Sequence, residues 1–266
     1  MTSAVSTSKI PYKQIRARQP PGQKTKTLVV YQAYSSAIAI PAAREQKLDA
    51  STAFRVGRMT WIKPSFLWCM YRSGWSYKDP NQERILAIEM TVEGFGELIR
   101  CSVGAMERDR PNIVSPSLPL SPLPAVTKGE MGTGTEMETE TETETETGGK
   151  EKQKGKEQEM EKEKEKGKVR FQWDPERNVK LERLPYRSLQ VGIAGGMVRR
   201  WIDEWIVRIE DVTEDVRRFH ALIENDGDQG VAKIVEELRG EKWREDVLQL
   251  EEELEMALGM PGDVAS

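Results

Sequence analysis

Residues 58–75, RMTWIKPSFLWCMYRSGW, place cations among large apolar side chains and contain no carboxylate. Arg58, Lys63 and Arg72 are spread among three tryptophans that recur at intervals of seven residues, Trp61, Trp68 and Trp75. A guanidinium keeps its proton at any ordinary pH, and it is costly to bury without a partner. These cations must therefore face water, pair with carboxylates that are distant in the sequence, or bind an anionic ligand.

Two other short stretches offer polar and aromatic groups that could complete a binding site. In TLVVYQAY, residues 27–34, strand alternation points Gln32 away from its two neighbours, and Tyr186-Arg187-Ser188 forms a second cluster. We predict a basic, aromatic-lined cleft that binds a phosphate-bearing ligand, either a nucleotide or a nucleic-acid end. The candidate ligand-binding residues are Tyr31, Gln32, Tyr34, Arg58, Trp61, Lys63, Arg72 and Arg187.

Internal ion pairs are the alternative to a ligand for these cations. Carboxylates that are distant in the sequence could neutralise them, and the candidates are Glu83, Glu89, Asp174 and Glu176. An arginine stacked on a tryptophan would be stabilised by about 0.5–2 kcal/mol in either arrangement. The sequence leaves both interpretations open.

The sequence lacks the residues that several kinds of catalytic site require. The only histidine is His220, so a Ser-His-Asp triad or a histidine-ligated metal would have to use it, and we interpret it as an exposed helix residue. No P-loop or dinucleotide-binding glycine motif is present. The glycines at 192, 195 and 196 could hold an anion at a helix start or simply form a tight connection. We predict no metal and no cofactor.

No catalytic residue can be assigned from these patterns. The near absence of histidine leaves glutamate, aspartate, tyrosine or lysine for proton transfer. Such residues are compatible with a nucleotide-using transferase of the ADP-ribosyl type. A non-catalytic protein-interaction or scaffold module is the alternative, in which a helix over 247–258 docks a protein partner through its apolar stripe.

The charge of the chain is unevenly distributed along its 266 residues. Residues 115–168, with TETETETET and EKEKEKGK, hold 9 Lys and 13 Glu, and residues 220–266 hold 4 basic and 13 acidic residues. The rest of the chain holds 27 basic and 18 acidic residues, a net charge of +9 within a total of −4. A basic body can attract nucleic acid or an anionic small molecule, or it can be neutralised by the acidic tail.

The pattern of apolar residues predicts one α+β domain that is interrupted by an insert. Strands are expected at 27–34, 83–91, 169–174, 188–195 and 206–212. Helices are expected at 37–48, 65–73, 93–101 and 197–205, after Thr213, and within 231–258. The expected organisation is a basic arm (1–27), two halves of a single mixed sheet-and-helix domain (28–114 and 169–219), a disordered insert between them (115–168) and an acidic helical tail (220–266).

The cysteine content and hydropathy suggest an intracellular protein, cytoplasmic or nuclear. Cys69 and Cys101 do not make a disulfide framework. No apolar run reaches the roughly 18 residues needed to span a bilayer, and no signal-like segment follows Met1. We therefore expect no membrane association.

Several motifs occur together in an order typical of one family. They are IPYKQIRA (10–17), VYQAY (30–34), residues 58–75, QERILAIE (82–89), QWDPER (172–177) and LPYRSLQVGI (184–193). On these motifs the chain resembles the family catalogued as domain of unknown function 4291, over residues 10–105 and 168–215. The resemblance implies a single domain and no particular activity. The chain departs from the family pattern in its insert and its long acidic tail.

Overall fold

Two apolar runs of the sequence form the long central strands, β2 (Thr27–Tyr34) and β4 (Arg84–Thr91), which pair antiparallel along their whole length. The computed structural model describes residues 12–20, 26–104 and 168–260, and in it both strands bury side chains on their two faces. Burial on both faces explains why neither run carries a polar stripe. The strands expected at 27–34 and 83–91 are confirmed.

The two central strands belong to a five-stranded antiparallel sheet in the order β8-β4-β2-β1-β9. β8 (Ile206–Asp211) flanks β4, while β1 (Arg16–Arg18) and β9 (Glu245–Val247) continue the sheet beyond β2. β1 lies within the expected basic arm. The expectation of helix within 231–258 is wrong at β9, because β1 offers that segment an unpaired strand edge.

A second, four-stranded sheet has the order β3-β7-β6-β5. Its strands are β3 (Thr60–Ile62), β5 (Ser102–Gly104), β6 (Val169–Arg177) and β7 (Arg183–Ile193). β6 and β7 form an antiparallel hairpin, and β5 pairs parallel with β6. A backbone bridge between Tyr31 and Lys63 links this sheet to the first one.

β6 continues through Pro175, where the sequence predicts that the strand ends. Opposite Pro175, the N–H of Arg187 donates to the carbonyl of Tyr12 and its carbonyl accepts from the N–H of Gln14. Both polar groups of Arg187 therefore point away from β6. Pro175 occupies a position that makes no ladder hydrogen bond, so its missing N–H costs nothing there.

The helices follow the predicted order with small shifts at their ends. α2 (Phe66–Ser73) and α3 (Val92–Arg100) confirm the helices expected at 65–73 and 93–101, and α5 (Gly196–Arg200) with the π-helical turn η2 (Trp201–Trp205) confirms the helix expected at 197–205. α1 (Ser36–Glu45) starts before the predicted position, so Pro41 lies inside it rather than in its first turn. The other helices are the 3-10 turn η1 (Pro80–Gln82), α6 (Thr213–Arg239) and α7 (Glu252–Ala257).

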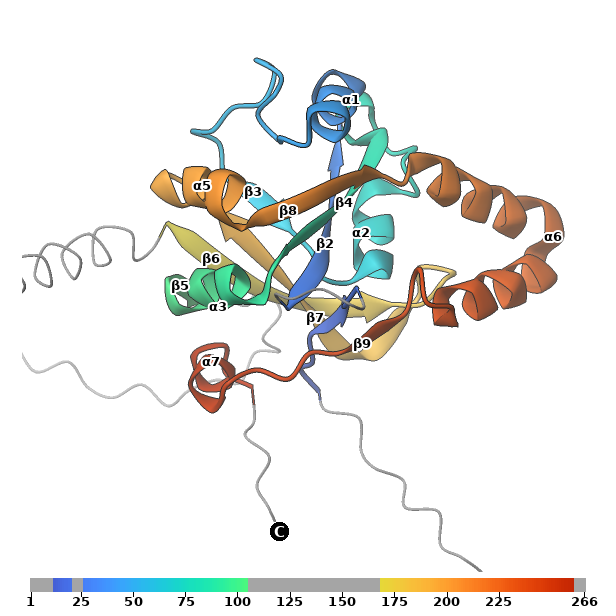
Figure 1. Cartoon of the computed structure of the whole chain (residues 1–266). Coiled ribbons are helices and arrows are strands. Elements are labelled where there is room, and N and C mark those ends of the chain that lie inside the picture. Colours follow the sequence, from blue (N-terminus) through green and yellow to red (C-terminus); the bar gives the residue numbers. More distant parts are fainter. Residues whose placement is uncertain (1–11, 21–25, 105–167, 261–266) are drawn as a thin grey trace, which may run out of the picture. The chain divides into compact units, whose positions relative to one another are not determined.

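The first sheet separates two apolar cores. One face of β2 and β4 packs with α3, α5 and the apolar face of β6 and β7, around Leu28, Val30 and Ile88. The other face packs with α2 and α6, around Val29, Tyr31 and Phe66. Figure 1 shows α2 and α6 on one side of the two central strands and α3 and α5 on the other. The α+β class is confirmed.

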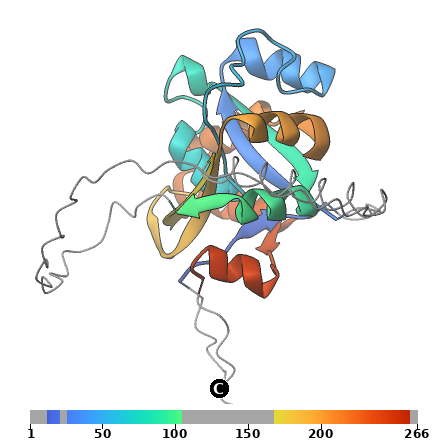
Figure 2. The ribbon, with the colours of Figure 1, turned by 90° about the vertical axis from the view of Figure 1, so that its left-hand side faces the viewer.

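The C-terminal segment is part of this unit instead of a free docking helix. Leu248, Leu254 and Leu258 are buried in the first core, and only Glu252–Ala257 of the expected helix 247–258 is helical. Leu254 and Leu258 of its apolar stripe are therefore used internally, while Val247 and Met256 are exposed. Figure 1 and Figure 2 show α7 at the opposite end of the folded unit (residues 12–20, 26–104 and 168–260) from α1.

The insert predicted at 115–168 lies outside the described residues except for Lys168, as do residues 1–11 of the expected arm. Within the described part of the chain, none of the helices combines the length and the apolar character that crossing a membrane requires.

Gly94 in α3 allows a close approach between this helix and the ring of Trp205. A Cβ atom placed on Gly94 would lie 2.3 Å from Cγ of Trp205. Trp205 is buried in the first core, so the ring has little room to move. The absence of a side chain at Gly94 therefore determines how η2 packs on α3.

We predict that Gly94→Ala destabilises the protein by about 1–3 kcal/mol, the usual cost of overpacking a core. Urea denaturation of the full chain measures the effect. Gly57→Ala is the matched control, because a Cβ there would have no atom within 4 Å. Equal midpoints for the two variants would contradict this account of the α3 packing.

Candidate functional site

The four cations of the sequence prediction lie at three separate places. Arg58 is exposed in the loop before β3, near Tyr34. Lys63 and Arg72 lie near Asp174 on β6. Arg187 lies on the opposite face of the hairpin, where its guanidinium donates to the Tyr12 hydroxyl at 2.6 Å and to the carbonyl of Trp173 at 2.8 Å. They do not converge on one cavity in the described residues.

The predicted aromatic and amide groups also separate. Tyr31 is fully buried in the second core, and burial raises the pKa of its phenol. Gln32 and Tyr34 form a small network with Thr60, in which the Tyr34 hydroxyl donates to Gln32 Oε1 at 2.8 Å and Gln32 Nε2 donates to Thr60 at 2.6 Å. Trp61 lies against Gly192 of β7. Tyr31 is thus a core residue.

The carboxylates considered as internal partners bind other groups. Glu83 accepts the backbone N–H of Ser36, and hydrogen bonds from Ser36 lower its pKa. Glu89 accepts the Thr27 hydroxyl at 2.6 Å. Among the ion pairs of the described residues, none involves Arg58, Lys63 or Arg72. The internal pairs that would have neutralised these cations are therefore not formed there.

A cavity of about 490 Å³ lies where α2, the β6–β7 hairpin, α6 and β9 meet. Its apolar walls come from Phe66 and Leu67 of α2, Leu184 of β7 and Leu238 of α6, together with the ring of Trp243. Two glutamates from different strands, Glu176 of β6 and Glu245 of β9, also line it. We call it the Glu176–Glu245 cavity.

The cavity exists at this place because the second sheet has one polar face. Alternation along β6 and β7 turns Trp173, Leu189 and Val191 toward the first core. The other face therefore carries polar side chains, and we call it the polar face: Gln172, Asp174, Glu176, Ser188 and Gln190. α2 packs against β6 from this side, and its N-terminal residues reach the cavity.

Both cavity glutamates are held by hydrogen bonds rather than by ion pairs. Glu176, 3% exposed, accepts the N–H of Arg177 at 2.8 Å and also bonds the hydroxyls of Ser65 and Ser188. Glu245 accepts the N–H of Phe66 at 2.6 Å, at the start of α2. Burial raises the pKa of both carboxyl groups, and for Glu245 the charge of Glu176 adds to the effect. The pair is therefore suited to exchange protons closer to neutral pH than ordinary glutamates do.

Four arginines surround the same cavity: Arg16, Arg177, Arg239 and Arg244. Arg239 and Arg244 pair with exposed carboxylates, Glu236 and Asp246. Arg16 and Arg177 instead donate to backbone carbonyls. Arg16 donates to the carbonyl of Glu245 at 2.8 Å, and Arg177 donates to that of Leu181 at 3.2 Å. Neither makes an ion pair with a carboxylate of the described chain. Both guanidinium groups thus lie at the cavity without a direct carboxylate partner, and the charge of Arg16 acts on Glu176 and Glu245 from a longer distance.

Two buried N–H donors of residues that line the cavity lack a hydrogen-bond partner among the described residues. They are Nε1 of Trp243, a residue that is 2% exposed, and Nε of Arg177. An unsatisfied buried donor costs about 1–3 kcal/mol. The Arg177 guanidinium stacks on the ring of Tyr71 with 3.7 Å between its Cζ and the ring centroid, which fixes its position. Both nitrogens lie beneath the cavity surface, so they oppose folding and are not presented to a ligand.

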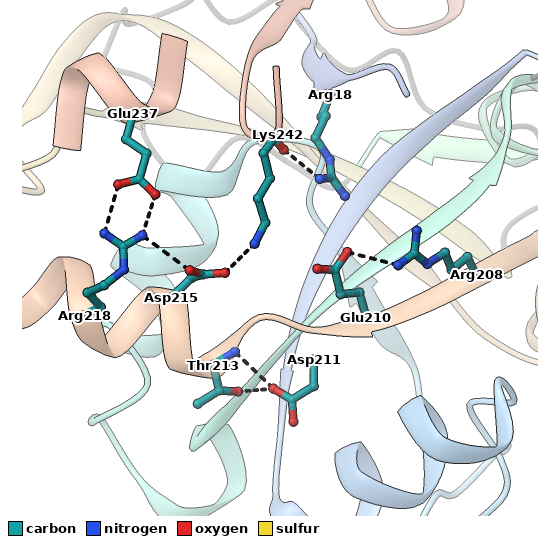
Figure 3. A network of polar contacts seen from close by, with 9 residues as sticks. All are labelled: Arg18, Arg208, Glu210, Asp211, Thr213, Asp215, Arg218, Glu237 and Lys242. Atoms are coloured by element: carbon teal, nitrogen blue, oxygen red, sulfur yellow. Dashed lines mark hydrogen bonds and ion pairs between the residues drawn. The ribbon is translucent and has the colours of Figure 1, made fainter. Parts of the chain in front are cut away.

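A network of ion pairs fastens the segment that forms one wall of the cavity (Figure 3). Lys242 pairs with Asp215 of α6 at 2.6 Å, and its carbonyl accepts a hydrogen bond from Arg18 of β1. Arg218 pairs with Glu237 near the end of α6. These contacts connect residues 237–242 to β1 and to the first turns of α6, so the wall that carries Trp243 and Glu245 is held in place.

Sequence reasoning missed this cavity although it considered Glu176 as an ion-pair partner. Arg16, Glu176, Tyr186 and Glu245 come from four strands, and no local pattern joins them. A signal was present in QWDPER, where Asp174 and Glu176 alternate with the apolar Trp173 in a strand. No group of three or more His, Cys, Asp or Glu side chains is placed to hold a metal ion within residues 12–20, 26–104 and 168–260.

A protein-family model described as domain of unknown function (DUF4291) matches residues 14–115 and 134–240. The matched residues include Arg16, Glu176 and Arg177 of the cavity and end before Trp243 and Glu245. No curated protein and no solved structure matches the chain.

We predict that Glu245→Gln removes a pH dependence from the stability of the protein. The folded-state pKa of Glu245 lies well above its ordinary value, so folding binds a proton that the unfolded chain has released. The stability contributed by this group is complete below the unfolded pKa of about 4.3 and is lost as pH rises, at up to about 1.4 kcal/mol per pH unit. Glutamine stays neutral and can still accept the N–H of Phe66, so the variant should exceed the parent in stability at pH 8.

Urea denaturation between pH 4.5 and 8 measures the difference between the two proteins. Glu253→Gln, at an exposed position of α7, is the matched control and should follow the parent at every pH. A Glu245→Gln curve that runs parallel to the parent curve would show that this carboxyl group is already ionised in the folded protein.

Proposed function

The chain belongs to the domain of unknown function 4291 family, and we propose that it binds a phosphate-bearing ligand with a flat apolar body, such as a nucleotide, in the Glu176–Glu245 cavity. The observation that carries the proposal is the pair Arg16 and Arg177, two guanidinium groups that bind carbonyl oxygens and make no ion pair in the described chain. Guanidinium groups bind phosphate oxygens through two parallel N–H bonds.

The charge balance of the cavity favours an anion. Arg239 and Arg244 are paired with Glu236 and Asp246, so the charges of Arg16 and Arg177 stand against the two cavity glutamates. The raised pKa of both glutamates favours their neutral form, which leaves a net positive charge at the cavity. A protonated carboxyl group also donates a hydrogen bond to a phosphate oxygen, whereas a carboxylate would repel it.

The remaining walls suit an apolar or aromatic ring. Phe66, Leu67, Leu184 and Leu238 provide apolar surface, and Trp243 adds an indole with an unsatisfied N–H. A volume of about 490 Å³ is within the range of small-molecule sites, about 300–1,000 Å³. A nucleotide offers both a ring for the apolar walls and phosphate oxygens for the guanidinium groups of Arg16 and Arg177.

The proposal keeps the ligand class inferred from the sequence and changes the residues that bind it. The sequence predicts cations without carboxylate partners beside aromatic rings at 58–75. At the cavity, Arg177 is such a cation, because its guanidinium lies over the rings of Tyr71 and Trp68. Of the candidates named from the sequence, none lines the cavity.

We predict that Arg177→Gln weakens the binding of ATP or AMP by about tenfold or more, since a hydrogen bond to a charged group is worth about 1.5–3 kcal/mol. Isothermal titration calorimetry on the full chain measures the affinity, and the Arg177 effect should shrink as salt is added.

Arg170→Gln is the matched control for this experiment. Arg170 lies on the same strand, is exposed and does not line the cavity. If nucleotides do not bind to the parent, or if the Arg170 and Arg177 variants lose the same affinity, the assignment of this cavity as the anion site is wrong.

The paired carboxyl groups favour a second candidate function, a nucleotide-using transferase of the ADP-ribosyl type. Glu176 and Glu245 lie in the cavity with the arginines, and their raised pKa suits them to accept a proton from an attacking hydroxyl. Incubation of the full chain with NAD and detection of released nicotinamide tests it. Release by the parent and not by Glu245→Gln supports the transferase, whereas nucleotide binding without release supports a binding protein.

A further inference from the structure

Lys63 lies at the junction of the two sheets, just after β3. Its N–H donates to the carbonyl of Tyr31 at 3.2 Å, and the N–H of Tyr31 donates to the carbonyl of Lys63 at 2.7 Å. This exchange fixes the backbone at Lys63 between the first and the second sheet. The alternation that turns Ile62 into the first core places Trp61 and Lys63 on the other side, the polar face of the second sheet.

The side chain of Lys63 is buried without a counter-ion. It is 8% exposed, and its Nζ donates to the carbonyl of Trp61 at 3.0 Å. Within the described chain no carboxylate oxygen lies within 4.0 Å of this nitrogen. The neighbouring Asp174 is held by two amides, from Gln172 at 2.8 Å and from Gln190 at 2.6 Å. An ammonium group placed in this way is costly to bury as a cation.

The groups around Lys63 favour the neutral amine. Burial is the largest cause of its lowered pKa, and the positive charge of Arg72 lowers it further. Burial raises the pKa of the Cys69 thiol to about 11, so that group carries no negative charge at neutral pH. The charge of Asp174 acts in the opposite direction and raises the pKa of Lys63, although burial raises the pKa of Asp174 itself.

Arg72 supplies an anion-binding group beside this amine. It is in the last turn of α2, is exposed, and forms no ion pair with the part of the chain that the structure describes. A lysine that is desolvated next to a second cation is the arrangement that makes an amine nucleophilic toward carbonyl compounds. The guanidinium can meanwhile hold a carboxylate or phosphate on the same reactant.

We propose that Lys63 is a nucleophilic amine that forms a Schiff base with a small anionic aldehyde or ketone, whose charged group binds to Arg72. The lone pair of Nζ attacks the carbonyl carbon, the C=O electron pair moves to oxygen, and a proton passes from nitrogen to that oxygen. The resulting carbinolamine loses its hydroxyl group together with the second N–H proton as water, which leaves a C=N bond. The site does not use the Glu176–Glu245 cavity and stands independently of the function proposed for it.

The experiment uses glyoxylate, an aldehyde that carries one carboxylate, with the full unsubstituted chain at pH 7. Cyanoborohydride reduces the imine to a stable carboxymethyl-lysine, and peptide mass spectrometry locates it. A lowered pKa raises the fraction of Lys63 that is a neutral amine at pH 7, so Lys63 should be modified faster than the exposed Lys78. Because the comparison is made within one folded chain, it does not depend on whether a Lys63 variant folds.

Arg72→Gln tests the anion-binding part of the proposal. It should slow the modification of Lys63 by glyoxylate more than that by acetaldehyde, which has no charged group. Lys78→Gln, which removes another exposed cation after α2, should leave both rates at Lys63 unchanged. Modification of Lys63 no faster than Lys78, or only in urea, would overturn the assignment of a reactive amine, and an equal effect of Arg72→Gln on both aldehydes would overturn the role of Arg72.

Discussion

The constraint on which this structure depends is the burial of β2 and β4 on both faces. Their side chains fill two cores, so the polar groups that the first sheet contributes to a site lie on its other strands, such as Arg16 of β1 and Glu245 of β9. The second sheet adds further ligand-binding groups, because one of its faces joins the first core and the other is polar. α2 packs between this polar face and β2. Both the Glu176–Glu245 cavity and Lys63 lie at that contact, which is why they are found there.

The polar groups at this contact lower the stability of the fold, which indicates that they are kept for another reason. Carboxyl groups with few charged partners, an ammonium without a carboxylate and indole N–H groups without acceptors each oppose folding. The surrounding structure compensates with rigid supports: the ladder between β2 and β4, the β6–β7 hairpin, and the ion pairs of Asp215 with Lys242 and Arg218. Perturbed groups on a rigid scaffold are typical of binding and catalytic sites.

The sequence predicts the local structure of this protein well and its site poorly, for one physical reason. Ser65 and Gly74 mark the ends of α2 because a hydroxyl can cap an N-terminus and glycine tolerates the left-handed conformation at a C-terminus, and such signals are local. The cavity joins Arg16, Glu176 and Glu245, which are brought together only by strand pairing over long separations. β9 pairs with β1 because the edge of β1 is open, and the residue types at 245–247 do not predict this pairing. The cluster at 58–75 is locally visible, yet its tryptophans separate, with Trp75 in the second core and Trp61 on β3.

α2 physically connects the two sites. Its first turn carries the Ser65 hydroxyl and the Phe66 N–H that hold Glu176 and Glu245, and its last turn carries Arg72. A helix of this length spans about 12 Å. The contacts of Glu176 and Glu245 at one end of α2 and the guanidinium of Arg72 at its other end therefore depend on the same helix, packed between β2 and β6. One helix thus positions groups of both sites, although the two sites have no residue in common.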